Sequence, residues 1–177
     1  MAIFRLKDNR PSIDPSAYMA PDTTVIGKVT IAKDSSVWFN CVLRGDADTI
    51  VVGRDTNIQD LCVLHTDPGK PVIIGNRVTI GHRSIIHGCE IEDYCLIGMG
   101  SIIMNGAKIR RGSIVAAGSV ILEDTVIPPF SLVAGVPGKV KRTMEENVLE
   151  EIHQAAQIYV DRIRLYQKPG ALVRLQS

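Results

Sequence analysis

The chain repeats an aliphatic residue every six positions, and this period constrains its fold more than any other feature. Two unbroken runs carry the period: Ile13, Met19, Val25, Ile31, Val37 and Leu43, and later Ile91, Ile97, Ile103, Ile109, Val115, Ile121, Ile127 and Val133. A small residue follows most of these positions four places later. A hexapeptide with one large and one small inward residue is a short strand plus a turn, and it buries its apolar position only by stacking on the next unit. The period therefore predicts an all-β solenoid.

Between the two runs the same register continues with two longer steps and, from 86 to 91, one step that is a residue short. The aliphatic positions there are Val52, Ile58, Leu64, Ile74, Ile80 and Ile86. The steps from 43 to 52 and from 64 to 74 exceed six residues, so each predicts an inserted loop. Three strands close a triangular coil of about eighteen residues, with coils about 4.8 Å apart. Aromatic residues make up only 5% of the chain, which suits so narrow an aliphatic core.

A helical pattern replaces the six-residue period after Val133. Thr143 and Glu146 have the spacing of a capping box. The apolar stripe that follows consists of Val148, Ile152, Ala155, Tyr159, Ile163 and Tyr166, and Pro169-Gly170 ends the helix. We expect this helix to lie along the outside of the solenoid.

These patterns divide the chain into four segments. They are a lead-in strand over 1–12, a parallel β-helix over 13–140, a C-terminal helix over 143–167 and a tail over 168–177.

Composition excludes several classes of protein. The chain has 177 residues, with 20 Lys and Arg against 19 Asp and Glu, so it lacks the basic excess of a nucleic-acid-binding protein. No apolar run reaches the length of a signal peptide or a membrane span, which predicts a cytoplasmic protein. The four cysteines, Cys41, Cys62, Cys89 and Cys95, lack the CxxC spacing of a zinc ribbon or redox motif. Cys41 and Cys62 occupy the small inward position in adjacent coils, which predicts stacked free thiols in the core rather than a disulfide.

Three of the four histidines fall where the repeat is interrupted. Arg44, His65 and His87 each follow an aliphatic residue of the same predicted face in successive coils, so they form one outward column. His65 and His87 are then one coil apart, close enough to share a metal ion. His153 lies on the predicted helix and is expected at the surface.

His82 occupies a different face, with Asp60 directly beneath it. A ligand on another face cannot close onto the His65/His87 pair within one chain, but threefold packing of solenoids would bring it from a neighbour. The spacing therefore suggests a metal site at a subunit interface, and by the same construction Arg44 faces Asp60 of the neighbouring subunit. The alternative is that each histidine is a surface or hydrogen-bonded residue; the clustering favours the metal site.

Several motifs together resemble the gamma-class carbonic anhydrase family over nearly the whole chain. They are Arg44-Gly45-Asp46, Asn57-Ile58-Gln59-Asp60, His65, Gly81-His82, His87-Gly88 and Ile97-Gly98-Met99-Gly100. The resemblance implies a left-handed β-helix, a hand that is an exception to the usual crossover rule. It also implies a homotrimer with one metal ion at each interface, Zn²⁺ or Fe²⁺, held by His65, His82 and His87.

The implied activity is that of a lyase, the reversible hydration of carbon dioxide to bicarbonate by a metal-bound hydroxide. Gln59 and Asn57 match family positions that orient the metal-bound water and bicarbonate, and Arg44 with Asp60 matches the interface ion pair. The chain departs from well-characterised members in lacking the glutamates that carry the proton away. Ala47 follows the arginine motif, and the loop over 66–71 has no glutamate. Asp67 and Tyr159 are the candidates for proton transfer.

Other functions stay open on the sequence. A metal-stabilised trimer with weak or no anhydrase activity could serve as an assembly module or hydrolyse a small ester or thioester. An acyltransferase is a further alternative, because many hexapeptide-repeat proteins transfer acyl groups. That chemistry needs a single histidine base and a groove for coenzyme A, and three clustered histidines argue against it.

Overall fold

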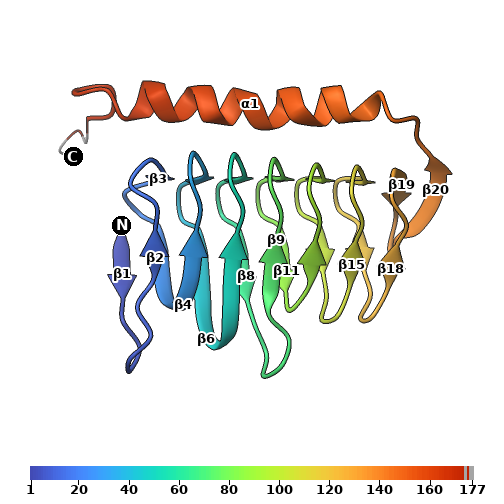
Figure 1. Ribbon diagram of the computed structural model, residues 1–177, viewed down its shortest axis with the longest axis horizontal. Coiled ribbons are helices and arrows are strands. Elements are labelled where there is room, and N and C mark those ends of the chain that lie inside the picture. The colour runs from blue at the N-terminus through green and yellow to red at the C-terminus, as the bar shows by residue number, and fades with distance from the viewer. Residues whose placement is uncertain (174, 176–177) are drawn as a thin grey trace.

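The chain forms a left-handed parallel β-helix of about seven turns with one C-terminal helix (Figure 1). The computed structural model describes residues 1–173 and 175, so part of the predicted tail, residues 174, 176 and 177, lies outside the described residues. Each turn contributes short strands to the faces of a triangular prism. The hexapeptide period is thus confirmed as a stack of coils.

Two of the three faces belong to one sheet, because two long strands bend around the edge of the prism between them. The face that we call the histidine face contains the first halves of β4 (Thr24–Ile31) and β6 (Val42–Val52), with β1 (Ala2–Phe4), β8 (Val63–His65), β11 (Ile85–His87), β14 (Ile102–Ile103) and β17 (Val120–Ile121). The charged face contains their second halves with β2 (Ser12–Ile13), β9 (Val72–Ile74), β12 (Glu90–Ile91), β15 (Lys108–Ile109) and β18 (Val126–Ile127).

The third face, which we call the helix face, is a separate sheet. Its strands are β3 (Tyr18–Met19), β5 (Ser36–Val37), β7 (Asn57–Ile58), β10 (Thr79–Ile80), β13 (Leu96–Ile97), β16 (Ile114–Val115), β19 (Ser131–Ala134) and the antiparallel β20 (Lys139–Thr143). The helix α1 (Val148–Tyr166) runs along this face, above the row of coils (Figure 1).

The core is the stack of inward aliphatic residues that the period predicts. Leu43 pairs with Leu64, which pairs with Ile86, and all three side chains are fully buried. All four cysteines are buried free thiols in or beside this column. The large aromatic side chains lie outside the prism, where Trp38 packs between Tyr159 and Tyr166 of α1. Burial of these rings attaches the helix to its face.

Two local expectations are corrected. The predicted capping box does not form, because Thr143 pairs with Ser131 at the end of β20, and α1 instead begins at Val148 with no side-chain cap from Asn147. The step from 43 to 52 is not a free loop: β6 runs through it as one strand, and the extra residues appear as a register shift against β4. The step from 64 to 74 does contain a loop, with an isolated bridge between Asp67 and Lys70.

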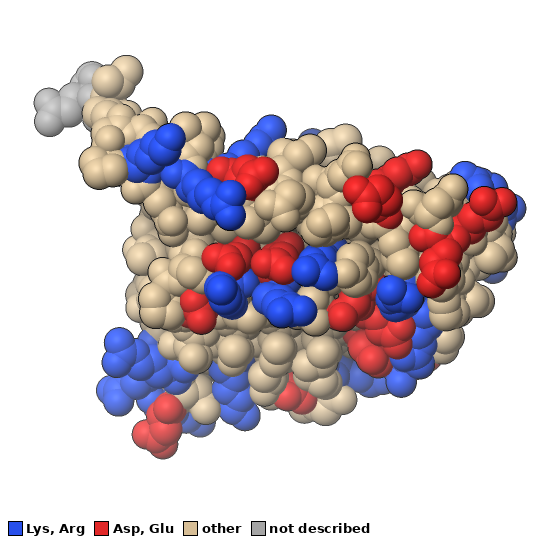
Figure 2. Space-filling view, turned by 45° about the horizontal axis from the view of Figure 1, so that its top comes forward, with Lys and Arg blue, Asp and Glu red and all other residues tan. Residues whose placement is uncertain are grey.

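The outer surfaces of the faces differ in chemistry. The charged face carries ion pairs such as Lys108–Glu90 and Arg110–Glu92. Figure 2 shows acidic and basic side chains interspersed across the middle of the visible surface, as the near balance of charge suggests. In the part of the chain that the structure describes, no helix has the length and apolar character needed to cross a membrane.

Candidate metal centre

His65 and His87 lie side by side at one edge of the histidine face. They are the last residues of β8 and β11, and their Cα positions pair directly in the parallel register, as the column count predicts. Arg44 of β6 is the next member of the same column. Nδ1 of His65 lies 2.9 Å from Nε2 of His87. Parallel pairing of adjacent coils therefore brings two imidazole nitrogens to one point.

The outer ring nitrogens of this pair are fixed by oxygen acceptors. Nε2 of His65 lies 3.0 Å from a carboxylate oxygen of Asp46, and Nδ1 of His87 lies 2.8 Å from the amide oxygen of Asn105. A carboxylate or amide oxygen only accepts, so both of these ring nitrogens carry a hydrogen. In neutral imidazoles the other nitrogens, Nδ1 of His65 and Nε2 of His87, are then lone pairs that face each other.

Two facing lone pairs at this distance fit a shared cation. Two nitrogens bound at 2.0–2.1 Å to one tetrahedral zinc ion lie about 3.3 Å apart, close to the observed separation. A carboxylate oxygen of Asp67 joins them, and the three donor atoms lie within 4.8 Å of one another. The donor set of this corner therefore fits a divalent metal of the kind that imidazole and carboxylate bind.

His82 lies at the opposite edge of the histidine face, on the corner that leads from β10 to β11. Its Nδ1 lies 2.8 Å from a carboxylate oxygen of Asp60, in the adjacent coil. The other carboxylate oxygen of Asp60 accepts the backbone N–H of Phe39 at 3.2 Å. In a neutral imidazole the Asp60 contact leaves the lone pair on Nε2 of His82, and 40% of the side chain is exposed. Within the described chain His82 does not join the His65/His87 cluster.

Gln59 and Asn57 form a buried chain of hydrogen bonds that leads to His82. Asn57 donates to Thr79 Oγ1 at 2.9 Å, and Gln59 Nε2 donates to Asn57 Oδ1 at 3.2 Å. Gln59 Oε1 accepts the backbone N–H of His82 at 3.2 Å. Gln59, His82 and Tyr159 line one open groove of about 510 Å³ between α1 and the helix face. The two predicted orienting residues thus lie on the His82 side of the molecule.

The remaining predicted residues have partners in the same chain. Arg44 forms an ion pair with Asp46, the residue that holds His65. Partial desolvation opposes ionisation of Asp46, but hydrogen bonds from Arg44 and His65 and the Arg44 charge outweigh it, so the pKa of Asp46 lies below its usual value. The predicted contact between Arg44 and Asp60 does not occur within one chain.

Tyr159, the second candidate for proton transfer, packs edge-on against Trp38 with ring centroids 5.3 Å apart. Burial raises the pKa of Tyr159, which keeps the phenol protonated.

Sequence reasoning missed two residues of this site. Asp46 was recognised only as part of a motif, and Asn105 was not singled out at all. A signal for Asn105 exists, because it follows His87 by eighteen residues, which is one full coil of the regular part of the solenoid. Residues one coil apart stack directly in a β-helix, so the coil length itself identifies it.

Comparison with known proteins supports the fold and the family. A family model described as "Bacterial transferase hexapeptide (six repeats)" matches residues 71–105 and 88–123. A Methanocaldococcus jannaschii protein named "Probable carbonic anhydrase" is 54% identical over 148 residues, 84% of this chain and 93% of that protein. The mitochondrial gamma carbonic anhydrase 2 of Arabidopsis thaliana is 39% identical over 93% of this chain, which spans 61% of that longer protein.

A solved structure has the same architecture. The hexapeptide transferase family protein from Anaplasma phagocytophilum superposes with a TM-score of 0.89 at 39% identity, over 93% of this chain and 98% of that chain. Fold and site together define a hexapeptide-repeat β-helix with a histidine cluster at its corner. Within that class, the relatives above show that the chain belongs to the gamma-class carbonic anhydrase family.

Proposed function

We propose that this protein interconverts carbon dioxide and bicarbonate at a divalent metal held between subunits. The observation that carries the proposal is the pair of facing lone-pair nitrogens on His65 and His87. His82 of a neighbouring subunit would supply the third ligand, since its free nitrogen lies at the other edge of the same face. Zn²⁺ and Fe²⁺ both suit a three-histidine site. The names of the curated relatives support a carbonic anhydrase-like activity.

The surface of the histidine face, between His82 at one edge and the His65/His87 pair at the other, supports a homotrimer. The outward side chains of the histidine face include apolar ones, and Val63 and Ile85 are each 40% exposed in the single chain. The helix face is covered by α1, and the charged face carries ion pairs of both signs. Among the described residues, the histidine face alone combines open apolar side chains with metal donors at both edges. Threefold packing would cover these side chains and bring the edges together.

When bound, the metal supplies acidification of water, so that a hydroxide nucleophile is available near neutral pH. This chain's own residues would position the ligands and the substrate. Asp46, Asp60 and Asn105 hold one nitrogen of each histidine, which directs the other toward the metal position. Gln59 fixes the His82 backbone and retains one amide hydrogen to donate to an oxygen of bicarbonate.

A second candidate is a metal-stabilised trimer with weak or no hydration activity. The observation that favours it is the absence of glutamate from the loop over 66–71, where Asp67 is already engaged by Asn105. An acyltransferase remains the third candidate, since the structurally similar protein carries the name of a transferase. These candidates differ in whether chelation abolishes activity.

The decisive experiment is stopped-flow carbon dioxide hydration by protein purified without oxygen and reloaded with Zn²⁺ or Fe²⁺. We expect hydration that a chelator abolishes, and a loss of both metal and activity in His82→Ala. Mixing His82→Ala with His65→Ala chains should restore part of the metal binding, because a mixed trimer regains intact interfaces. Metal-free protein with full activity would refute the proposal. Metal binding without hydration would favour the second candidate, and coenzyme A binding the third.

A further inference from the structure

Asn105 connects an acidic and a basic side chain at the candidate metal centre, Asp67 and His87. It belongs to the loop after β14, one coil beyond His87, and its side chain is half-buried. Its amide oxygen lies 2.8 Å from Nδ1 of His87, and its amide nitrogen donates to a carboxylate oxygen of Asp67 at 2.8 Å. A single amide therefore joins a loop carboxylate to a ligand imidazole.

The carboxylate fixes which way this amide points. A carboxylate accepts only, so the atom of Asn105 that faces Asp67 must be the NH₂ group. The oxygen of Asn105 is then the atom that faces His87, and Nδ1 of His87 must carry the hydrogen. His87 therefore donates to Asn105, and Asn105 donates to Asp67. Nε2 of His87 is left as a lone pair toward His65.

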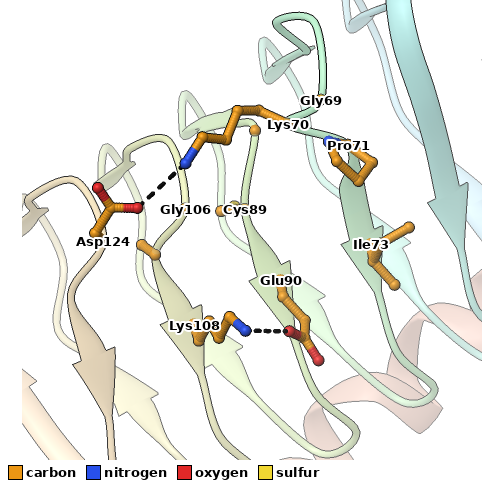
Figure 3. Close-up of a pocket in the computed structure, with 11 residues that line it drawn as sticks. Gly69, Lys70, Pro71, Ile73, Cys89, Glu90, Gly106, Lys108 and Asp124 are labelled. Atoms are coloured by element: carbon orange, nitrogen blue, oxygen red, sulfur yellow. Dashed lines mark hydrogen bonds and ion pairs between the residues drawn. The ribbon is translucent and has the colours of Figure 1, made fainter.

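The surrounding backbone makes room for this arrangement. Gly88 directly follows His87 with a φ of +51°, and a Cβ built on it would lie 2.1 Å from the amide oxygen of Asn105. Only glycine lets the amide approach this closely. The loop that carries Asp67 is held in turn by Lys70, whose Nζ lies 3.2 Å from Asp124 (Figure 3). Figure 3 shows Lys70 reaching across the corner beside Gly106 to that carboxylate.

We propose that Asn105 is a positioning residue that holds His87 in its Nδ1–H form, and that Asp67 acts on the metal site through Asn105. This inference rests on the proposed metal centre and adds to it. It gives the short loop a structural role in metal binding, in place of a role in proton transfer. Residues that orient a metal-ligating histidine in this way typically change metal affinity 10–100-fold when removed.

The test is the zinc affinity of full-length variants, measured by competition with a chromophoric chelator. We expect Asn105→Ala to weaken zinc binding about 10–100-fold. Asn105→Asp should bind more tightly than Asn105→Ala, because a carboxylate oxygen still accepts the His87 hydrogen. Asp67→Asn should weaken zinc binding, but less than Asn105→Ala, because an amide oxygen can still accept from Asn105 although it no longer fixes the direction of that amide. A proton carrier would instead lose turnover in that variant.

The matched control is Asn76→Ala. Asn76 is another half-buried asparagine whose amide donates to a carboxylate, that of Asp93, but it touches no histidine. We expect this variant to keep wild-type zinc affinity whatever its stability. Equal losses in Asn76→Ala and Asn105→Ala would show a general structural effect and overturn the inference, as would unchanged affinity in Asn105→Ala.

A second readout separates this inference from the proposed function. Nitrogen-15 NMR of the metal-free protein at about pH 8, where free histidine is neutral, reports which ring nitrogen of His87 carries the hydrogen. We expect hydrogen on Nδ1 in the wild type. Hydrogen on Nε2 would overturn the role of Asn105 even if zinc binds. Wild-type protein that binds no zinc would refute the metal centre while leaving the NMR result to decide the role of Asn105.

Discussion

The three histidines proposed as metal ligands each have the same kind of hydrogen-bond partner. Each gives a ring hydrogen to a side-chain oxygen, His65 to Asp46, His82 to Asp60 and His87 to Asn105. In a neutral imidazole the second nitrogen is then a lone pair, which is the form that binds a metal. An isolated surface histidine has no need of such a partner, so the repetition argues for ligands.

The residue scale also shows where sequence reasoning stops. The six-residue period places His65 beside His87 and Asp60 beneath His82, because both relations depend only on backbone register. It does not show that Asp46 turns back to His65, since that contact depends on side-chain rotamers and on the register shift in β6. The Arg44–Asp60 pair stays a prediction about a neighbouring subunit, because within one chain Arg44 pairs with Asp46.

The buried cysteines predict a loss of stability at alkaline pH. Burial raises the pKa of Cys89 and of Cys95 to about 12 each, against about 8.5 in an unfolded chain. Between these values the unfolded state binds fewer protons, so stabilisation that is complete below about pH 8.5 is lost as pH rises. We expect the free energy of unfolding to fall by up to about 1.4 kcal/mol per pH unit for each of these thiols.

Urea unfolding under reductant at several pH values from about pH 8 to about pH 11 measures this slope. Cys89→Ala should be less stable near pH 8 because it loses packing, but its stability should fall less steeply with pH than that of the wild type. The same slope in both proteins would contradict the assignment to Cys89.

At the scale of secondary-structure elements, the corners between short strands decide what the solenoid can hold. Gly88 and Gly118 both have positive φ, but a Cβ at Gly88 would collide with Asn105, whereas one at Gly118 meets nothing within 4 Å. Gly118→Ala should therefore cost only about 1 kcal/mol of backbone strain. Gly88→Ala should add the displacement of Asn105.

We expect Gly88→Ala to weaken zinc binding about tenfold or more, by removing the acceptor for His87. Gly118→Ala should leave zinc affinity unchanged while showing the cost of alanine at a corner. Thermal unfolding and chelator competition on both variants measure the two effects separately. Equal zinc affinity in the two variants would mean that Gly88 makes no room for a ligand-positioning group.

The period predicted the strands and the helix themselves well, but it predicted the residue at which the helix starts poorly. The aliphatic columns follow from spacing, and in the helix Ile152 and Ile163 are buried as the stripe requires, but the buried alanine is Ala156 and not the predicted Ala155. The start of the helix does not follow, because antiparallel pairing of β20 with β19 uses Thr143 as a strand residue. Tertiary pairing here outweighs a local capping signal.

At the scale of the whole molecule, one chain holds only part of the proposed metal centre. His65 and His87 lie at one edge of the histidine face and His82 at the other, and apolar side chains occupy the surface between them. Assembly and metal binding should therefore be coupled: whatever separates the subunits removes the third ligand from each site. This coupling is testable without altering any metal ligand.

Ile85→Asp should dissociate the proposed trimer. Ile85 is 40% exposed in the single chain and lies next to the inward Ile86 on β11, so packing of three histidine faces would bury it. A buried, unpaired carboxylate costs about 3–5 kcal/mol at such a contact. We expect sedimentation velocity to show smaller species at micromolar concentration, and zinc affinity to fall because His82 of the neighbouring subunit is lost.

Ile73→Asp supplies the matched control for that experiment. Ile73 is 37% exposed and occupies the equivalent outward position of β9, but it lies on the charged face. This variant should remain a trimer with wild-type zinc affinity, because that face takes no part in the proposed interface. Dissociation by both substitutions would point to general destabilisation. A trimeric Ile85→Asp protein that binds zinc normally would place the interface elsewhere, and with it the third ligand.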